Sequence, residues 1–479
     1  MANLFASIAA AGSALRAFEQ ALEVTQNNVT NASTPGYARQ RLILEAASFS
    51  ADGSLAGGVT AGALLSARDA YAEQEVWSRL ENLGYFTQQQ STLGAIESSF
   101  DISGTDGVFG AMTSLFQSFS AWSVSPSNSA TRTAVLEAAG QMARVFQQSA
   151  SDLSRISSQT DRQLQQTVTR INELAGLVRD CNAERLRSGS EDPGLDARLH
   201  AALEELAEIT DFDVLREADG SYTLLLGGQS PLVFGETVHE VSLSYSSPAD
   251  QPPVYPNAAP RARILDGTGN DVTGQISKGQ LGALLETRNQ LLPSLIGDAY
   301  QQGDLNRLAQ AMADQVNQLL ASGLVSDGPP PQPGVALFTY DSSNPTAVAA
   351  TVAVSPSIAP EQLAAIAAGP PYVSNGTALK LAQLGSPAGG TGQIDDLGFV
   401  EFYAGLAAKV GRRVTAARDG SEVQTQLVAQ ARTLRQQTSG VSLDEEAVML
   451  IQFQRAYQAA AKMISILDDL TEMTVNLVN

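Results

Sequence analysis

At both ends of this chain, apolar side chains recur at alternating steps of four and three residues, and no other sequence feature constrains the fold as strongly. The N-terminal stripe comprises Leu4, Ile8, Ala11, Leu15, Phe18, Leu22, Thr25 and Val29. The C-terminal stripe comprises Leu443, Leu450, Phe453, Tyr457, Ala460, Ile464, Leu467, Thr471, Thr474 and Val478. This spacing is typical of a coiled-coil seam. An isolated amphipathic helix is marginally stable, whereas each buried large apolar side chain contributes about 1.5–3 kcal/mol. We therefore expect the two terminal helices to bury their stripes against each other.

Both predicted terminal helices have clear limits. Pro35 and Gly36 cannot continue the first helix, which we expect to stop near Asn31. A capping box is predicted at the start of the second helix, where Ser442 and the glutamate three residues later face exposed backbone N–H groups. Asp444 adds negative charge near the same helix N-terminus, where it is favourable.

The region between the terminal helices is predicted to be mainly helical with some β structure. Helices are expected over 71–96, 129–186, 196–209, 281–320 and 397–437, the fourth with a bend or break near Pro293 and Gly303. Hairpins are expected over 212–245, and short extended segments over 59–66, 335–340 and 348–354. The predicted fold class is mainly α with a small β component. We expect an elongated chain with a terminal coiled coil and a helical-bundle middle domain carrying β hairpins.

Three parts are predicted along the chain. Residues 1–45 together with 439–479 form a terminal coiled-coil assembly domain. Residues 46–323 together with 393–438 form an α-rich main domain. Residues 324–392 include a proline-rich run near their start and a Gly/Pro-rich patch at their end, and they are expected to form a small insertion or surface subdomain.

Charge and hydropathy exclude several partner classes. The chain carries 29 Lys and Arg against 50 Asp and Glu, and 29 − 50 gives a net charge of −21. Such a field repels phosphate backbones and anionic membrane surfaces, so nucleic acid is not an expected partner. No stretch approaches the roughly 18 apolar residues of a membrane span, so none is expected. Residues 1–15 lack the basic segment of a cleaved signal peptide, so if the protein leaves the cell we expect a route that reads an uncleaved N-terminus.

Residues with catalytic or metal-binding chemistry are few. His200 and His239 are the only histidines, and the sequence contains no HExxH, CxxC or P-loop pattern. Cys181, the only cysteine, lies on a helical stripe and is expected to be a buried thiol, while His200 is expected to be a surface or packing residue. The polar segment that begins at Asp266 favours a turn over a cation site. We therefore expect no catalytic residue, no metal site and no cofactor.

Two terminal segments resemble a known family. Asn31-Ala32-Ser33-Thr34-Pro35-Gly36-Tyr37-Ala38-Arg39-Gln40 resembles the signature of bacterial flagellar rod, hook and hook-associated proteins. The block 439–446, followed by 452–457, looks like the C-terminus of the hook-associated protein 1 (FlgK) family. Internal stretches at 62–71 and 279–285 are also similar to segments of that family. The positions that carry the signature are Asn31, Thr34, Pro35, Gly36, Tyr37, Arg39, Gly440, Leu443, Asp444, Glu445 and Glu446.

The resemblance implies a non-enzymatic structural subunit at the junction between flagellar hook and filament, outside the cell. Export would run through the flagellar type III channel with the help of an export chaperone. The implied partners are further copies of the chain in a helical ring, the hook protein and the second junction hook-associated protein. The expected assembly seam comprises Leu4, Ile8, Leu15, Phe18, Leu22, Val29, Leu450, Phe453, Tyr457, Ile464 and Leu467.

Two alternatives remain open at this point. A flagellar rod or hook subunit shares the signature at 31–39, although the block at 439–446 favours the junction protein. A secreted adhesin or enzyme using the same export route would need a catalytic or ligand-binding cluster, which the sequence does not display.

Overall fold

A computed structural model describes residues 2–48, 57–100, 107–188, 192–247, 251–387 and 393–478 of the chain. These residues form two compact units. Unit 1 comprises Met1–Asn82, Ile171–Glu240 and Gln424–Asn479, and unit 2 comprises Leu83–Arg170 and Val241–Val423. Helices account for 63% of the structure and strands for 13%, which confirms a mainly α fold with a small β component. Within the described residues, no helix is both long enough and apolar enough to cross a membrane.

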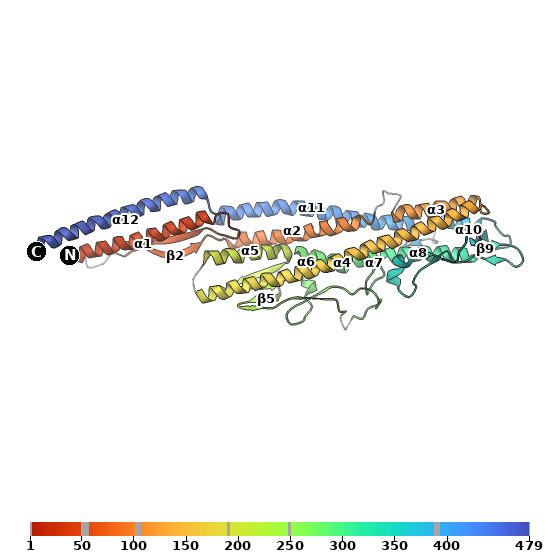
Figure 1. The fold of residues 1–479 in the computed structure, drawn as a ribbon, viewed down its shortest axis with the longest axis horizontal. Helices are drawn as coiled ribbons and strands as arrows, with labels where there is room; N and C mark the ends of the chain where they lie inside the picture. The colour runs from red at the N-terminus through yellow and green to blue at the C-terminus, as the bar shows by residue number, and fades with distance from the viewer. Residues whose placement is uncertain are drawn as a thin grey trace. The chain divides into compact units, whose positions relative to one another are not determined.

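The two ends of the chain pair within unit 1. Helix α1 (Ala2–Thr30) runs antiparallel to α12 (Leu443–Val478), and Figure 1 shows them side by side with their free ends together. The predicted pairing of the terminal helices and the helix stop near Asn31 are thus confirmed. Strands β1 (Gln40–Ala47) and β2 (Gly58–Ser66) form an antiparallel hairpin that also packs on α1.

The rest of unit 1 combines helix ends with a small sheet. Helix α5 (Pro193–Ile209) begins with Asp192, whose side chain accepts hydrogen bonds from two backbone N–H groups of the first turn. Beyond it lies a four-stranded antiparallel sheet of β3 (Phe212–Arg216), β4 (Tyr222–Leu226), β5 (Ser230–Phe234) and β6 (Thr237–Val238). Its turns use glycines with positive φ at Gly220, Gly227 and Gly228, which confirms the predicted hairpins.

Unit 2 is built around one large apolar cluster. Unit 2 contains α3 (Val108–Val124), α10 (Gly376–Gln383) and parts of three long helices. These long helices are α2 (Ala70–Glu97), α4 (Ser129–Ser188) and α11 (Phe399–Ser439). Trp122, Phe119, Phe146 and Tyr403 are fully buried in this cluster. Residues 324–392 also contribute, through Leu337, Phe338 and Leu381 among others.

The helical region expected over 281–320 is interrupted. It consists of α6 (Gly279–Glu286), a π-helical turn (Thr287–Leu291), α7 (Leu292–Ile296) and α8 (Asp304–Ser322). The predicted break at Gly303 is confirmed, and this glycine has φ +84°. Pro293 lies in the first turn of α7, directly after the π-helical turn, which is consistent with its lack of a backbone N–H.

The expected strand over 348–354 is wrong for its first half. Residues Val348–Thr351 form the short helix α9, and only Ala353–Val354 (β12) pairs with Phe338–Thr339 (β11), which is also the only part of 335–340 in a strand. Pro345, in the 3₁₀ turn Pro345–Ala347 that leads into α9, favours helical φ there. The Oδ1 atom of Asn306 accepts the backbone N–H of Ala349, which fixes the start of α9.

Further short elements complete the described structure. They are β7 (Ser242–Ser244), β8 (Arg263–Leu265), β9 (Gly323–Ser326), β10 (Gln332–Pro333), β13 (Ile366–Ala367), β14 (Gln393–Ile394), β15 (Leu397–Gly398) and 3₁₀ turns at Thr273–Gln275 and Pro360–Gln362. β9 is the middle strand of a three-stranded sheet with β10 and β13. Helix α3 was not predicted, although its buried residues Val108, Met112, Leu115, Phe119 and Trp122 recur at the three- and four-residue spacing of an amphipathic helix.

Candidate functional site

The segment 31–40, termed the signature loop below, joins the end of α1 to β1 and folds over α5. Gly36 has φ +73°, a conformation that residues with a Cβ rarely adopt. A Cβ at this position would lie 2.2 Å from the carbonyl oxygen of Ala197 on α5. Glycine is therefore required at this position both for the turn and for the close approach to α5.

The amide of Asn28 connects α1, the signature loop and α12. Its Nδ2 donates to the carbonyl oxygen of Gln40 (2.9 Å) and to Oε2 of Glu446 (3.1 Å). Its Oδ1 accepts from the hydroxyl of Tyr37 and from the backbone N–H of Gln40, both at 2.9 Å. Asn28 is 1% exposed. These four hydrogen bonds use both protons of Nδ2 and both lone pairs of Oδ1, so no polar group of this buried amide is left without a partner. It was not predicted as a site residue, because its signal is a single polar residue beside the apolar stripe.

Arg39 completes this arrangement, termed the junction cluster (Asn28, Tyr37, Arg39, Gln40, Glu445, Glu446). Its Nε lies 2.8 Å from Oε1 of Glu446, and its Nη1 lies 2.7 Å from Oε2 of Glu445. Glu446 is fully buried, whereas the side chain of Glu445 is 63% exposed. Burial and the nearby charge of Glu446 raise the pKa of Tyr37 to about 12, so its hydroxyl remains a donor at neutral pH.

The predicted capping box is only half present. The backbone N–H of Glu445 points to Oγ of Ser442 at 3.5 Å, as a cap requires. The carboxylate of Glu445, which would return to the cap residue in a full box, pairs with Arg39 instead. The ion pair between the two ends of the chain thus replaces one local interaction.

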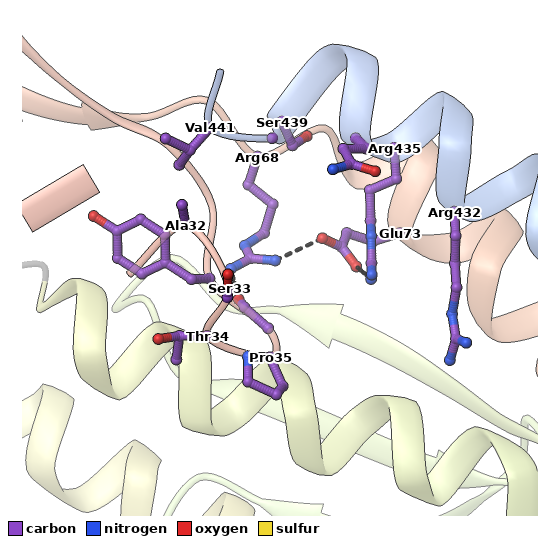
Figure 2. A pocket seen from close by; sticks show the side chains of 14 residues that line it. Ala32, Ser33, Thr34, Pro35, Arg68, Glu73, Arg432, Arg435, Ser439 and Val441 are labelled. Atoms are coloured by element: carbon purple, nitrogen blue, oxygen red, sulfur yellow. Dashed lines mark hydrogen bonds and ion pairs between the residues drawn. The ribbon is translucent and has the colours of Figure 1, made fainter. Parts of the chain in front are cut away.

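Arg68 connects the signature loop directly to α2 and α5, and through Glu73 to α11. Its Nη2 donates to the carbonyl oxygen of Gly36 (2.6 Å), and its guanidinium pairs with Glu73 (2.6 Å) on α2 and Asp196 (2.8 Å) on α5. Glu73 also pairs with Arg435 (3.1 Å) on α11. Figure 2 shows Arg68, Glu73 and Arg435 beside a hollow of about 270 Å³ that residues of the signature loop also line.

His200 packs beneath the same charges and stays neutral. It is 3% exposed, stacks on Trp77 at 5.8 Å between ring centroids, and meets the edge of Tyr222. Burial lowers the pKa of His200 to about 3, although Asp196 opposes this effect. The structure therefore makes His200 a packing residue. The expectation of a buried thiol at Cys181 is also confirmed, and burial raises its pKa.

The expected seam residues lie along the α1–α12 pair with different exposures. Val29 is 40% exposed, and the fully buried position beside it is Asn28. Leu443, 56% exposed, lies one turn before the buried Glu446, and the side chain of Val478 lies outside the described residues. The half-buried seam residues are Leu4, Ile8, Leu15, Phe18, Leu22, Leu450, Phe453, Tyr457, Ile464 and Leu467.

The signature residues outside the junction cluster shape the loop and the helix ends. Asn31 caps α1, because its Nδ2 donates to the carbonyl of Asn27 and its Oδ1 accepts from Thr34. Thr34 and Pro35 are exposed at the tip of the loop. The backbone N–H of Gly440 closes the last turn of α11, and Asp444 is exposed in the first turn of α12.

This arrangement holds helices together by charge and hydrogen bonding. Within the described part of the chain, no group of three or more His, Cys, Asp or Glu side chains is placed to hold a metal ion. The junction cluster uses its carboxylates in ion pairs that connect chain segments, and such pairing is structural.

Comparison with known proteins identifies relatives of this arrangement. Residues 93–338 match the family described as "Flagellar hook-associated protein FlgK helical domain". Residues 433–477 match "Flagellar basal body rod FlgEFG protein C-terminal", and residues 8–37 match "Flagella basal body rod protein". The last two ranges cover most of the α1–α12 pair and part of the signature loop.

Individual relatives agree. The chain is 26% identical to flagellar hook-associated protein 1 of Bacillus subtilis (strain 168), over 99% of each protein. It is 24% identical to the protein of the same name from Salmonella typhimurium, over 66% of this chain and 56% of the relative. The fold is similar to that of the flagellar hook junction protein FlgK from Burkholderia pseudomallei, with a TM-score of 0.62 and 14% identity over 77% of this chain and all of that one.

Proposed function

Because the chain belongs to the flagellar hook-associated protein FlgK family, it is a structural component of the bacterial flagellum at the hook–filament junction, and we propose that it polymerises there through α1 and α12. The family places the chain in the extracellular flagellum and confirms the resemblance found in the sequence. The family is a structural one, so its function is assembly.

One observation carries the polymerisation proposal: α12 has a second apolar stripe that faces away from α1. The members of this outer stripe, each at least 43% exposed, are Val448, Ile451, Met463, Ile466, Leu470 and Met473. They recur at helical spacing, with Arg455 and Ala459 between the second and third. At 100° per residue they lie opposite the face that contains Glu446, Phe453 and Ile464. An extended apolar surface of this kind marks an interaction site.

Identical copies that meet through this outer stripe form a wall of helices. The stripe on α12 contacts a different surface of the next copy, so the contact is heterologous and generates a ring or helix. In this proposal residues 1–45 and 439–479 are the assembly domain. Residues 46–323 with 393–438 form the main domain, and 324–392 form a small insertion that adds buried side chains such as Leu337 and Leu381 to the apolar cluster of unit 2.

Export and partners belong to the same proposal. The chain leaves the cell through the type III channel without cleavage and with a chaperone. It then contacts the hook protein on one side and the second junction hook-associated protein on the other. The mutual dependence of α1 and α12 supports export of an unfolded chain, because neither helix buries its stripe until both ends have left the channel.

The proposal is tested by complementing a strain that lacks the gene. We expect that strain to keep its hooks and to shed filament protein, and loss of the hook would point to a rod or hook subunit instead. Ile466→Asp places a charge in the outer stripe and should yield a secreted, folded chain that does not enter the flagellum. Ser465→Asp, at an exposed position outside the stripe, is the matched control and should be incorporated. Normal incorporation of Ile466→Asp contradicts the proposal.

A further inference from the structure

Building on the function proposed above, we propose that Glu446, held by Asn28 and Arg39, sets the register in which α12 pairs with α1. Two long helices with repeating stripes can slide along each other, and a polymer of identical copies requires one register. A single buried polar position is a known means of choosing among registers, at some cost in stability.

The apolar part of the pairing discriminates poorly between registers. The large apolar seam residues, among them Leu15, Phe453 and Ile464, are only half-buried. Partly exposed side chains make fewer contacts than fully buried ones, so no single apolar contact fixes the register. The stripes repeat every seven residues, so a slip of one heptad, about 10 Å at 1.5 Å per residue, again places apolar residues opposite apolar residues.

The junction cluster, in contrast, favours one register of α12 against α1 over the registers one heptad away. A slip of one heptad in one direction brings Phe453 to the position of Glu446. Asn28 Nδ2 then loses one of its two acceptors, and Arg39 loses its buried carboxylate. Unpaired buried donors and charges are strongly unfavourable, so only the observed register satisfies the cluster.

The orientation of Asn28 is fixed independently of α12. Tyr37 and Gln40 occupy its Oδ1, and the carbonyl of Gln40 occupies one proton of Nδ2, so the remaining proton points to Glu446. Thr25, the other buried polar residue among the described side chains of α1, donates to the carbonyl of Ala21 in its own helix, so this bond does not involve α12. The Asn28 amide is therefore oriented toward Glu446 by residues of α1 and the signature loop alone.

Glu445 provides a matched control for Glu446. Both carboxylates pair with the guanidinium of Arg39, but only that of Glu446 is buried and also bonded to Asn28. An exposed ion pair contributes little to stability, so removal of Glu445 should leave the register unchanged.

The register is measured as a distance within one chain by double electron–electron resonance. Spin labels are placed at Glu23→Cys on α1 and Glu472→Cys on α12, both exposed, in a Cys181→Ser background, because Cys181 is the only native cysteine. Because Asn28 lies opposite Glu446 in this antiparallel pair, the two labels are separated by about 21 residues, or about 30 Å, along the helix axis, so an axial slip changes their distance by nearly its full length. The full-length chain is assembled with an excess of unlabelled chain, so that only distances within one chain are read. We expect one distance for the parent and for Glu445→Ala. Glu446→Ala should add a population displaced by about 10 Å, the length of one heptad.

A second variant moves the recognition residue. The exchange Glu446→Phe with Phe453→Glu keeps both side chains but shifts the carboxylate by one heptad, so the main distance should move by about 10 Å. A native distance, or a broad distribution without a displaced peak, in this variant overturns the inference. The proposed function fails separately, as a parent chain that shows the native distance and yet does not enter the flagellum.

Discussion

Arg39 and Glu446 come from opposite ends of the chain and form an ion pair with 2.8 Å between Nε and Oε1. The two halves of the family signature, which appear as unrelated motifs in the sequence, are therefore one constellation in space. Glu446 is completely buried and Arg39 is 18% exposed, so the pair is shielded from solvent and each partner depends on the other.

Removal of Glu446 should destabilise the terminal helices far more than removal of Glu445. Glu446→Ala leaves the Arg39 guanidinium and an Asn28 proton without their buried acceptor, at a cost of about 3–5 kcal/mol. Glu445→Ala removes a mostly exposed partner of the same arginine and should cost under about 1 kcal/mol. Amide hydrogen exchange in α1 of the assembled chain measures the loss of stability in each variant. Equal protection of α1 in the two variants would show that the burial of Glu446 does not distinguish it from Glu445.

Gly36 and Gly94 should respond to alanine in opposite directions. Gly36→Ala forces a Cβ into a left-handed backbone 2.2 Å from the Ala197 carbonyl, so the signature loop must leave α5 and the midpoint of urea unfolding of unit 1 should fall. Gly94 lies within α2, where an added Cβ would have no neighbour within 4 Å, so Gly94→Ala should stabilise by up to about 1 kcal/mol. Urea denaturation of the full chain, followed by circular dichroism, tests whether the unfolding midpoint falls in Gly36→Ala and rises in Gly94→Ala. An unchanged midpoint for Gly36→Ala would show that the loop is not held as described.

The terminal pairing was predictable because its signal is local. A heptad stripe in residues 4–29 and another after Leu443 fix which faces are apolar, and the stop at Pro35 and Gly36 fixes where α1 ends. The glycine-marked turns of the sheet in unit 1 were predictable for the same reason.

What the sequence concealed depends on contacts between distant segments. Nothing near Asn28 or Glu446 indicates that they meet, and the apolar stripe alone placed Val29, not Asn28, in the seam. The Arg68 interactions join α2, α5 and α11 through residues that each look like ordinary surface charges in the sequence. Helix α9 was missed because its β-branched valine favours a strand locally, while Asn306 and burial favour the helix.

His200 should make unit 1 less stable in mild acid. Its pKa is about 3 in the folded chain and about 6.5 when unfolded, so the unfolded state binds more protons below pH 6.5. Stability is therefore lost as the pH falls from about 6.5, by up to about 1.4 kcal/mol per pH unit, until the folded pKa is reached. Between pH 5 and 6.5 most carboxylates remain ionised, so this window isolates the histidine.

His200→Phe tests this linkage because phenylalanine retains a ring against Trp77 but does not titrate. The slope of unfolding free energy against pH between 5 and 6.5 should flatten in the variant, whatever its stability at pH 7. An unchanged slope would assign the acid sensitivity to other groups.

Ile464 and Ile466 should separate pairing from polymerisation, because they lie two residues apart on opposite faces of α12. Ile464 is half-buried on the side of α1, whereas Ile466 is 48% exposed in the outer stripe. Ile464→Asp puts a charge into the pairing seam and should abolish hydrogen-exchange protection of both terminal helices. Leu15→Asp on α1 should act in the same way. Ile466→Asp should retain the α1–α12 distance measured by spin labels and lose only incorporation into the flagellum. If both isoleucine variants lose pairing, or if both are incorporated, the two faces of α12 do not have the separate roles assigned to them here.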